Sequence, residues 1–283
     1  MTTPLQVNWE YEPQQASVVL ERGVSLVYET LGKGPALTAV NSAFLIAPMW
    51  RSFTQQIVQR NRVITYDMRN QGESSVDPDA TWQDHVDDLG HVLDAAEADR
   101  TYLVTSSASA LLCRDFALAH PERVAGMILL GPALSPHGGG RRKAINKTWL
   151  TTLEKVGSDA LWDQLWSLTL SAAGIEAQGP AAYVALREAF VAMMDSPALL
   201  SNLRTAMDAD DDPELLTRIA CPTLLIVGDC DFMVGPSDLQ KLAELIPDCE
   251  TLYLPQVGHL PYWEATAEFE RATIEFIDRV EGS

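Results

Sequence analysis

The sequence has few basic residues for its size and no long apolar segment. Of its 283 residues, 20 are lysine or arginine and 39 are aspartate or glutamate, so the formal net charge is −19. A chain this acidic repels phosphate backbones and anionic membrane surfaces. Its apolar runs are too short to span a bilayer, and residues 1–15 lack the basic start and apolar run of a signal peptide. We therefore expect a cytoplasmic protein that binds neither nucleic acid nor membranes.

The usual patterns of metal and dinucleotide sites are also missing. The four cysteines form no C-x-x-C pair and have no zinc-binding spacing with histidine. Neither a G-x-G-x-x-G nor an H-E-x-x-H motif occurs. These absences predict a protein without a metal ion or cofactor, whose cysteines are free thiols in a reducing compartment.

Short apolar runs alternate with longer amphipathic stretches along much of the chain. Continuous apolar runs, typical of strands buried on both faces, occupy 36–40, 62–67, 101–105, 126–131, 223–228 and 250–254. Apolar residues at three- and four-residue spacing predict helices over 48–60, 80–97, 107–119, 237–246 and 264–280. With a hairpin over 16–30 in front, this alternation indicates an α/β fold with a mostly parallel, doubly wound sheet. His85 and His91, on the charged helix 80–97, are expected at the surface.

Residues 137–215 interrupt the alternation. The glycine-rich segment PHGGGRRK is followed by amphipathic helical stretches with no strand-like run between them. We expect residues 137–215 to form an all-helical cap, inserted into a core made of residues 1–136 and 216–283.

Three segments carry a resemblance to the α/β-hydrolase family that extends over nearly the whole chain. LVTSSASALL lies where a strand gives way to a helix, the place of the family's G-x-S-x-G nucleophile elbow. DCDFMVGP follows the strand 223–228, and LPQVGHLPYWE resembles the family's histidine loop. The order along the chain is also that of the family. The resemblance implies an α/β-hydrolase fold with an inserted helical cap.

The resemblance implies Ser107 as nucleophile, Asp231 as acid and His259 as base, with Asp229 as a competitor for the acid. A serine hydroxyl needs a base within hydrogen-bond reach, and the base needs a carboxylate that orients it. Both glycines of the elbow are replaced, by Thr105 and Ser109. The local pattern therefore also fits a seam of small residues between helix and sheet.

The resemblance also implies an oxyanion hole formed by two backbone amides. One is the amide of Ala108, which follows the nucleophile at a helix N-terminus. The other is the amide of Ala43 in AVNSAFLIAPMW, where Asn41 and Ser42 replace the family's His-Gly pair, as in the similar NS…MW stretch of enol-lactone hydrolases. In YDMRNQGESS, which resembles the family's D-x-R-G-x-G-x-S turn, we expect mainly structural roles for Asp67, Arg69 and Gly72.

A cap that closes over the elbow must present some side chains to the substrate, although helical spacing alone also fits a cap core. The predicted pocket residues are Asn41, Phe44, Trp162, Trp166, Phe190 and Met194.

Three functions remain open, because a fold does not fix a function. The first is hydrolysis of an ester, thioester or lactone of a small-to-medium apolar or polyketide-like acyl group, free or bound to coenzyme A or a carrier protein. The second is a lyase or acyltransferase, such as an eliminase that releases acetate from an acetylated natural-product intermediate with histidine as base. The third is a ligand-binding protein without catalysis.

Overall fold

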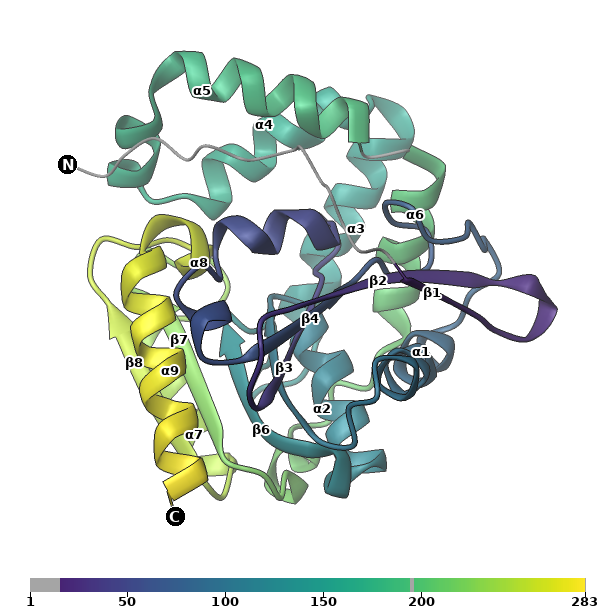
Figure 1. Cartoon of the computed structure of the whole chain (residues 1–283). Helices are drawn as coiled ribbons and strands as arrows, with labels where there is room; N and C mark the ends of the chain where they lie inside the picture. The colour runs from purple at the N-terminus through teal and green to yellow at the C-terminus, as the bar shows by residue number, and fades with distance from the viewer. Residues whose placement is uncertain (1–15, 194–195, 283) are drawn as a thin grey trace.

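The computed structural model describes residues 16–193 and 196–282 and contains an eight-stranded sheet of order β1-β2-β4-β3-β5-β6-β7-β8 (Figure 1). The strands are β1 Ala16–Val19, β2 Ser25–Leu31, β3 Ala36–Val40, β4 Arg62–Tyr66, β5 Thr101–Ser106, β6 Val124–Leu130, β7 Thr223–Gly228 and β8 Cys249–Leu254. β2 pairs antiparallel with β1 and β4, and the other pairs are parallel. The prediction of a mostly parallel, doubly wound α/β sheet is confirmed.

Helices cover both faces of the sheet, which explains the continuous apolar runs. β3, β5, β6 and β7 are buried along their whole length. One core cluster packs α1 (Trp82–Ala95), α2 (Ser109–Ala119) and α7 (Pro236–Leu245) against the sheet. A second cluster packs α8 (Pro261–Glu264) and α9 (Thr266–Gly282) against it together with residues 45–58. Burial on both faces removes the polar alternation that a one-sided strand would show.

The helix predicted over 48–60 is wrong. This segment forms two short 3-10 helices, Ala47–Ser52 and Ile57–Gln59. The backbone carbonyl of Trp50 accepts from the Phe53 amide at 2.9 Å and from the Thr54 hydroxyl at 2.9 Å. The Phe53 amide thus bonds to the residue three positions earlier, as in a 3-10 helix, and 3-10 helices are usually short.

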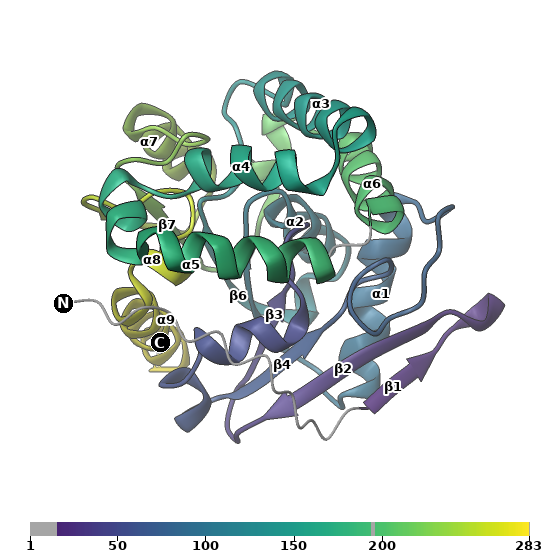
Figure 2. The same cartoon turned by 90° about the horizontal axis from the view of Figure 1, so that it is seen from above.

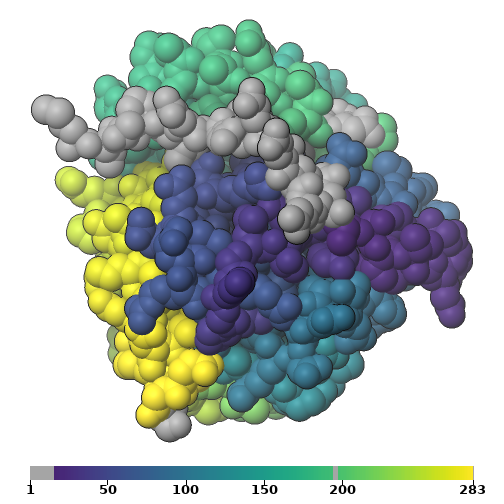
Figure 3. All heavy atoms as spheres, viewed as in Figure 1, coloured from purple at the N-terminus to yellow at the C-terminus, as the bar shows by residue number. Residues whose placement is uncertain are grey.

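Four helices lie between β6 and β7: α3 Gly140–Lys155, α4 Ser158–Thr169, α5 Ala172–Met193 and α6 Ser196–Thr205. Figure 2, seen from above, shows α4 and α5 lying across the sheet, with α3 and α6 beside them. The space-filling view in Figure 3 shows these green helices as the upper layer of the molecule. No helix of the described residues is long and apolar enough to cross a membrane. We propose that residues 137–215, which contain these helices, form a cap on a core made of residues 1–136 and 216–283.

His85 is buried, so its expected surface position is wrong, whereas His91 is exposed as expected. His85 shares the inward face of α1 with Asp88, whose carboxylate receives two hydrogen bonds from the buried Arg69 at 2.8 and 2.9 Å. The ion pair of Arg69 with Asp88 satisfies the charged groups on this side of α1, so that this side, including His85, can pack inside the protein. Burial, together with the positive charge of Arg69, lowers the pKa of His85 from 6.5 to about 4.

The buried His85 should make the fold sensitive to mild acid. Below pH 6.5 the unfolded chain binds a proton at His85, whereas the folded chain does so only near its folded pKa of about 4. The free energy of unfolding should therefore fall by about 3 kcal/mol between pH 7 and pH 4 from this group alone. Urea unfolding across this range should show that extra loss in the native chain and not in His85→Gln. Equal losses in both chains would contradict the assignment.

Candidate active site

Ser107 occupies a sharp turn between β5 and α2. Its φ is 56°, in the left-handed region that side chains other than glycine rarely adopt. The turn is held on both sides: the Ser107 amide donates to the carbonyl of Leu130 at 3.1 Å, and the Ser107 carbonyl accepts from the Ala133 amide at 2.9 Å. This conformation, fixed by β6 and the residues after it, presents the hydroxyl to the pocket described below.

The structure brings Ser107, His259 and Asp231 into one chain of hydrogen bonds. The Nε2 atom of His259 lies 3.0 Å from the Oγ atom of Ser107. On the other side of the ring, Nδ1 lies 3.0 and 3.1 Å from the two carboxylate oxygens of Asp231. His259 and Asp231 are buried. Asp229, the competing acid, instead accepts from the amide of Gln256 at 2.7 Å.

The carboxylate of Asp231 is held in its ionised form. Burial alone raises its pKa, but the positive charge and hydrogen bond of His259 act in the opposite direction. The backbone amides of Met233 and Val234 also donate to Oδ1, at 2.6 and 3.2 Å. The net effect is a pKa below the usual range, so Asp231 can orient the imidazole and balance a charge on it.

The loop that carries His259 is bonded to the end of α4. The His259 amide donates to the carbonyl of Thr169 at 2.7 Å. The carboxylate of Glu264 accepts from the amides of Gly258 and Ser171, both at 2.9 Å, and from the Ser171 hydroxyl at 2.6 Å. Burial raises the pKa of Glu264 despite these bonds. The position of His259 is therefore tied to the helices above the sheet.

The two amides predicted for the oxyanion hole both belong to residues that line the same pocket as Ser107. Within the described residues, neither the amide of Ala43 nor that of Ala108 donates a hydrogen bond to another protein group. Ala108 directly precedes α2, so its amide lies at the positive end of the helix dipole.

Asn41 does not line the pocket; its side chain is completely buried below it in a polar network. Its Nδ2 donates to the carbonyl of Tyr66 at 2.9 Å, and its Oδ1 accepts from the Trp50 indole at 2.9 Å. The position of Asn41 in the motif suggested a pocket residue. Its side chain instead bonds to these groups inside the protein. Met194 lies outside the described residues.

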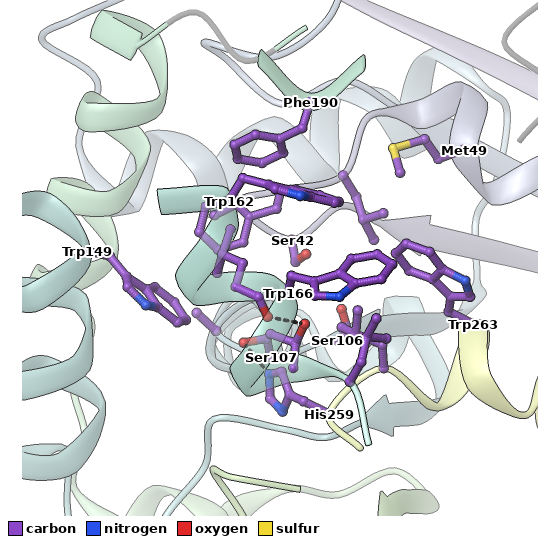
Figure 4. A pocket seen from close by; sticks show the side chains of 18 of the residues that line it. Ser42, Met49, Ser106, Ser107, Trp149, Trp162, Trp166, Phe190, His259 and Trp263 are labelled. Atoms are coloured by element: carbon purple, nitrogen blue, oxygen red, sulfur yellow. Dashed lines mark hydrogen bonds between the residues drawn. The ribbon is translucent and has the colours of Figure 1, made fainter. Parts of the chain in front are cut away.

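A cavity of about 1020 Å³, part of it open to solvent, lies between the elbow and the helices above it. Phe44, Trp162, Trp166 and Phe190 line it, as the sequence suggested. Figure 4 shows Phe190, Trp162 and Trp166 arranged in succession above Ser107. The ring centroids of Trp162 lie 5.2 Å from Phe190 and 5.5 Å from Trp166. Among the described residues, the lining contains no aspartate, glutamate, lysine or arginine.

Several lining residues escaped the sequence analysis, among them Met49, Asn146, Trp149 and Trp263. The edge-to-face contact of Trp149 with Phe44, with ring centroids 5.4 Å apart, joins residues far apart in the chain, so helical spacing alone does not reveal it. Trp263 follows His259 by four residues, so the histidine loop itself was the available signal.

The strain at Ser107 should be measurable as stability. Replacing Ser107 by glycine removes the cost of a left-handed side chain, about 1 kcal/mol, whereas alanine keeps that cost. Both variants lose the hydroxyl and its bond to His259. Chemical denaturation should therefore show Ser107→Gly more stable than Ser107→Ala by about 1 kcal/mol. A glycine variant no more stable than the alanine variant would mean that the turn is unstrained.

Comparisons with known proteins show the family to which the chain belongs. Residues 39–272 match the model of the Alpha/beta hydrolase family. The RutD protein of Variovorax paradoxus, which carries the name of a carbamate hydrolase, is 29% identical over 234 residues, covering 78% of this chain and 82% of its own. The pimeloyl-[acyl-carrier protein] methyl ester esterase of Aeromonas hydrophila is 22% identical over 92% of this chain and all of its own.

A solved structure shows the same fold. The thermophilic esterase of Thermogutta terrifontis superposes with a TM-score of 0.83 at 23% identity, covering 94% of this chain and 99% of its own. The family match spans well over half of the chain. The chain described here is thus a member of the alpha/beta hydrolase family.

Proposed function

We propose that this protein is a serine hydrolase that cleaves an ester, thioester or lactone of an uncharged, apolar acyl group. The observation that carries the proposal is the hydrogen-bonded chain from Ser107 through His259 to Asp231, which opens into an aromatic pocket. The relatives support it with names that refer to ester and carbamate hydrolysis.

In the first step, the Oγ atom of Ser107 attacks the substrate carbonyl carbon while His259 Nε2 takes the hydroxyl proton. Asp231 holds the ring and balances the charge that forms on it. When the tetrahedral intermediate collapses, the bond to the leaving group breaks and His259 protonates that group. Water, deprotonated by His259, then attacks the acyl-serine ester, and the acid and free Ser107 are released.

The amides of Ala43 and Ala108 stabilise the oxyanion in both steps. Both residues line the pocket next to Ser107, and neither amide donates elsewhere in the described chain. Donors fixed in advance stabilise the developing charge without reorganisation, which makes them a large part of catalysis in such sites.

Gln71 fixes the direction of the Ala43 amide. Its Nε2 donates to the carbonyl of Ser42 at 2.9 Å, and its Oε1 accepts from Asn41 at 3.3 Å. The Ser42 carbonyl and the Ala43 amide belong to one trans peptide, so they point in opposite directions. A hydrogen bond that holds the carbonyl on the core side therefore holds the N–H on the pocket side.

The side chains that line the pocket restrict the charge of the acyl group. Its aromatic and aliphatic walls bury apolar groups favourably, and a carboxylate placed among them would lose its hydration without a cation to pair with. The acyl group is therefore uncharged. The leaving group is not defined by these walls, and a small alcohol, coenzyme A or a carrier-protein thiol would all suit the chemistry.

Labelling with a fluorophosphonate tests the nucleophile. The native chain should be labelled, and Ser107→Ala should not, with kcat/KM for p-nitrophenyl esters falling about 10³-fold or more. Ser106→Ala is the matched control, because it removes the neighbouring hydroxyl and should leave labelling intact. Labelling that persists in Ser107→Ala would overturn the proposal. Turnover of an acetylated substrate that survives this substitution but not His259→Ala would favour elimination.

Replacing Gln71 by leucine should lower kcat rather than raise KM. The freed Ser42–Ala43 peptide would no longer present its N–H to the oxyanion, at a cost of up to the roughly 10²-fold loss seen when one such donor is removed. Affinity for a boronic acid, which mimics the tetrahedral intermediate, should fall in parallel. A raised KM with unchanged kcat would place Gln71 in substrate binding instead.

A further inference from the structure

The walls of the apolar pocket contain hydrogen-bond donors that have no protein partner. The Nδ2 of Asn146, the Nε1 of Trp162 and the Nε1 of Trp263 are buried, and each lacks a hydrogen-bond partner within the described residues. All three residues line the cavity above Ser107. Asn146 and Trp162 are 3% and 8% exposed, so bulk water does not reach most of either side chain.

Asn146 is the least expected of these groups. It lies on the inward face of α3, between Arg142 and Trp149. Arg142 on this face is paired with Asp211 at 2.7 Å and 3.0 Å, whereas Asn146 lines the cavity and its Nδ2 has no such partner within the described residues. Burying an amide without a hydrogen bond costs about 1–3 kcal/mol. A leucine in this place would complete the apolar wall without that cost.

An unpaired donor in a binding pocket is satisfied when the ligand brings an acceptor. Nδ2 and the indole Nε1 groups only donate, so the complementary ligand atom is an acceptor oxygen. The lining contains no lysine or arginine among the described residues, and a carboxylate would remain without a counter-charge. An uncharged oxygen, as in a ketone, an ether or a second ester, meets both conditions.

We propose that Asn146, with Trp162 as a second donor, forms a polar subsite that binds an uncharged oxygen of the acyl group, distinct from the scissile carbonyl. The inference rests on the proposed function in one respect: it assigns this oxygen to the acyl part of the substrate and not to the leaving group. The substrate class is then an oxygenated but uncharged acyl ester, thioester or lactone. A plain hydrocarbon chain leaves the donors unpaired, so the pocket discriminates against it.

Binding without turnover tests this subsite independently of catalysis. Calorimetric titrations of the Ser107→Ala protein would compare butyrophenone with butylbenzene, which has the same carbon skeleton and lacks the oxygen. A third ligand, 4-phenylbutyrate, adds a negative charge. The ratio of the two neutral dissociation constants removes the part of the affinity that comes from the apolar walls.

Adding Asn146→Leu should shift the ratio of dissociation constants about tenfold toward butylbenzene, the factor expected for one hydrogen bond. Trp162→Phe keeps the ring, removes the N–H, and should shift the ratio in the same direction, which guards against misfolding of the leucine variant. Trp82→Phe is the matched control: it removes an indole N–H on α1 that bonds to Asp115 outside the pocket lining, and it should leave the ratio unchanged. We expect 4-phenylbutyrate to bind at least tenfold more weakly than the ketone.

The proposal is overturned if the ratio changes less than twofold in both Asn146→Leu and Trp162→Phe. Equal affinity for 4-phenylbutyrate and butyrophenone would overturn the uncharged class. Because these ligands are not hydrolysed, a failure here leaves the fluorophosphonate result untouched. A failure of the labelling experiment likewise leaves the titrations interpretable.

Discussion

The left-handed backbone of Ser107 is the constraint on which the rest of the site depends. A side chain in this conformation costs about 1–2 kcal/mol, and the protein meets that cost by anchoring the turn to neighbouring strands. The hydroxyl of Thr105 donates to the carbonyl of Val40 at 2.8 Å, and that of Ser109 to the carbonyl of Asn41 at 2.7 Å. Where the family pattern has glycines, this chain uses small hydroxyl residues that fit the crowded crossing and bond across it.

The same principle extends to the histidine and the helices above it. Gly131 has a φ of 48°, and a Cβ there would lie 2.7 Å from the Asp231 carboxylate and 2.9 Å from the His259 ring. The end of β6 thus leaves room for the Asp231–His259 pair beside it. At the C-terminal end of α4, the carbonyl of Thr169 and the carboxylate of Glu264 accept hydrogen bonds from the loop that carries His259. Movement of these helices would therefore act on the base as well as on the pocket.

Local patterns predicted those parts of the molecule whose cause is local. Continuous apolar runs gave the buried strands, because burial on both faces leaves a direct signature in the sequence. The burial of His85 was missed, since it depends on a partner outside its own helix, the Arg69–Asp88 pair. The 3-10 turns around Trp50 were missed for another reason: apolar residues at three- and four-residue spacing do not distinguish a 3-10 helix from an α-helix.

For the site, order along the chain predicted which residues come together, and the structure places Ser107, His259 and Asp231 within hydrogen-bonding distance. The residues that line the pocket could not be predicted as well from their order along the chain. Asn41 turned inward to the Trp50 indole, while nothing in the sequence distinguishes Asn146 from the other polar residues of α3. Which face of a helix above the sheet meets the cavity is decided by packing between segments, which no single segment encodes.

The central claim is that Ser107 becomes acylated during turnover. The most direct measurement is intact-protein mass spectrometry of samples quenched within the first turnovers of p-nitrophenyl butyrate, followed by peptide mapping. The account predicts one butyryl group per chain, on the peptide containing Ser107, that disappears as the ester is consumed. A butyryl adduct on a different peptide, with none on the peptide containing Ser107, would contradict it and would show that Ser107 is not the nucleophile.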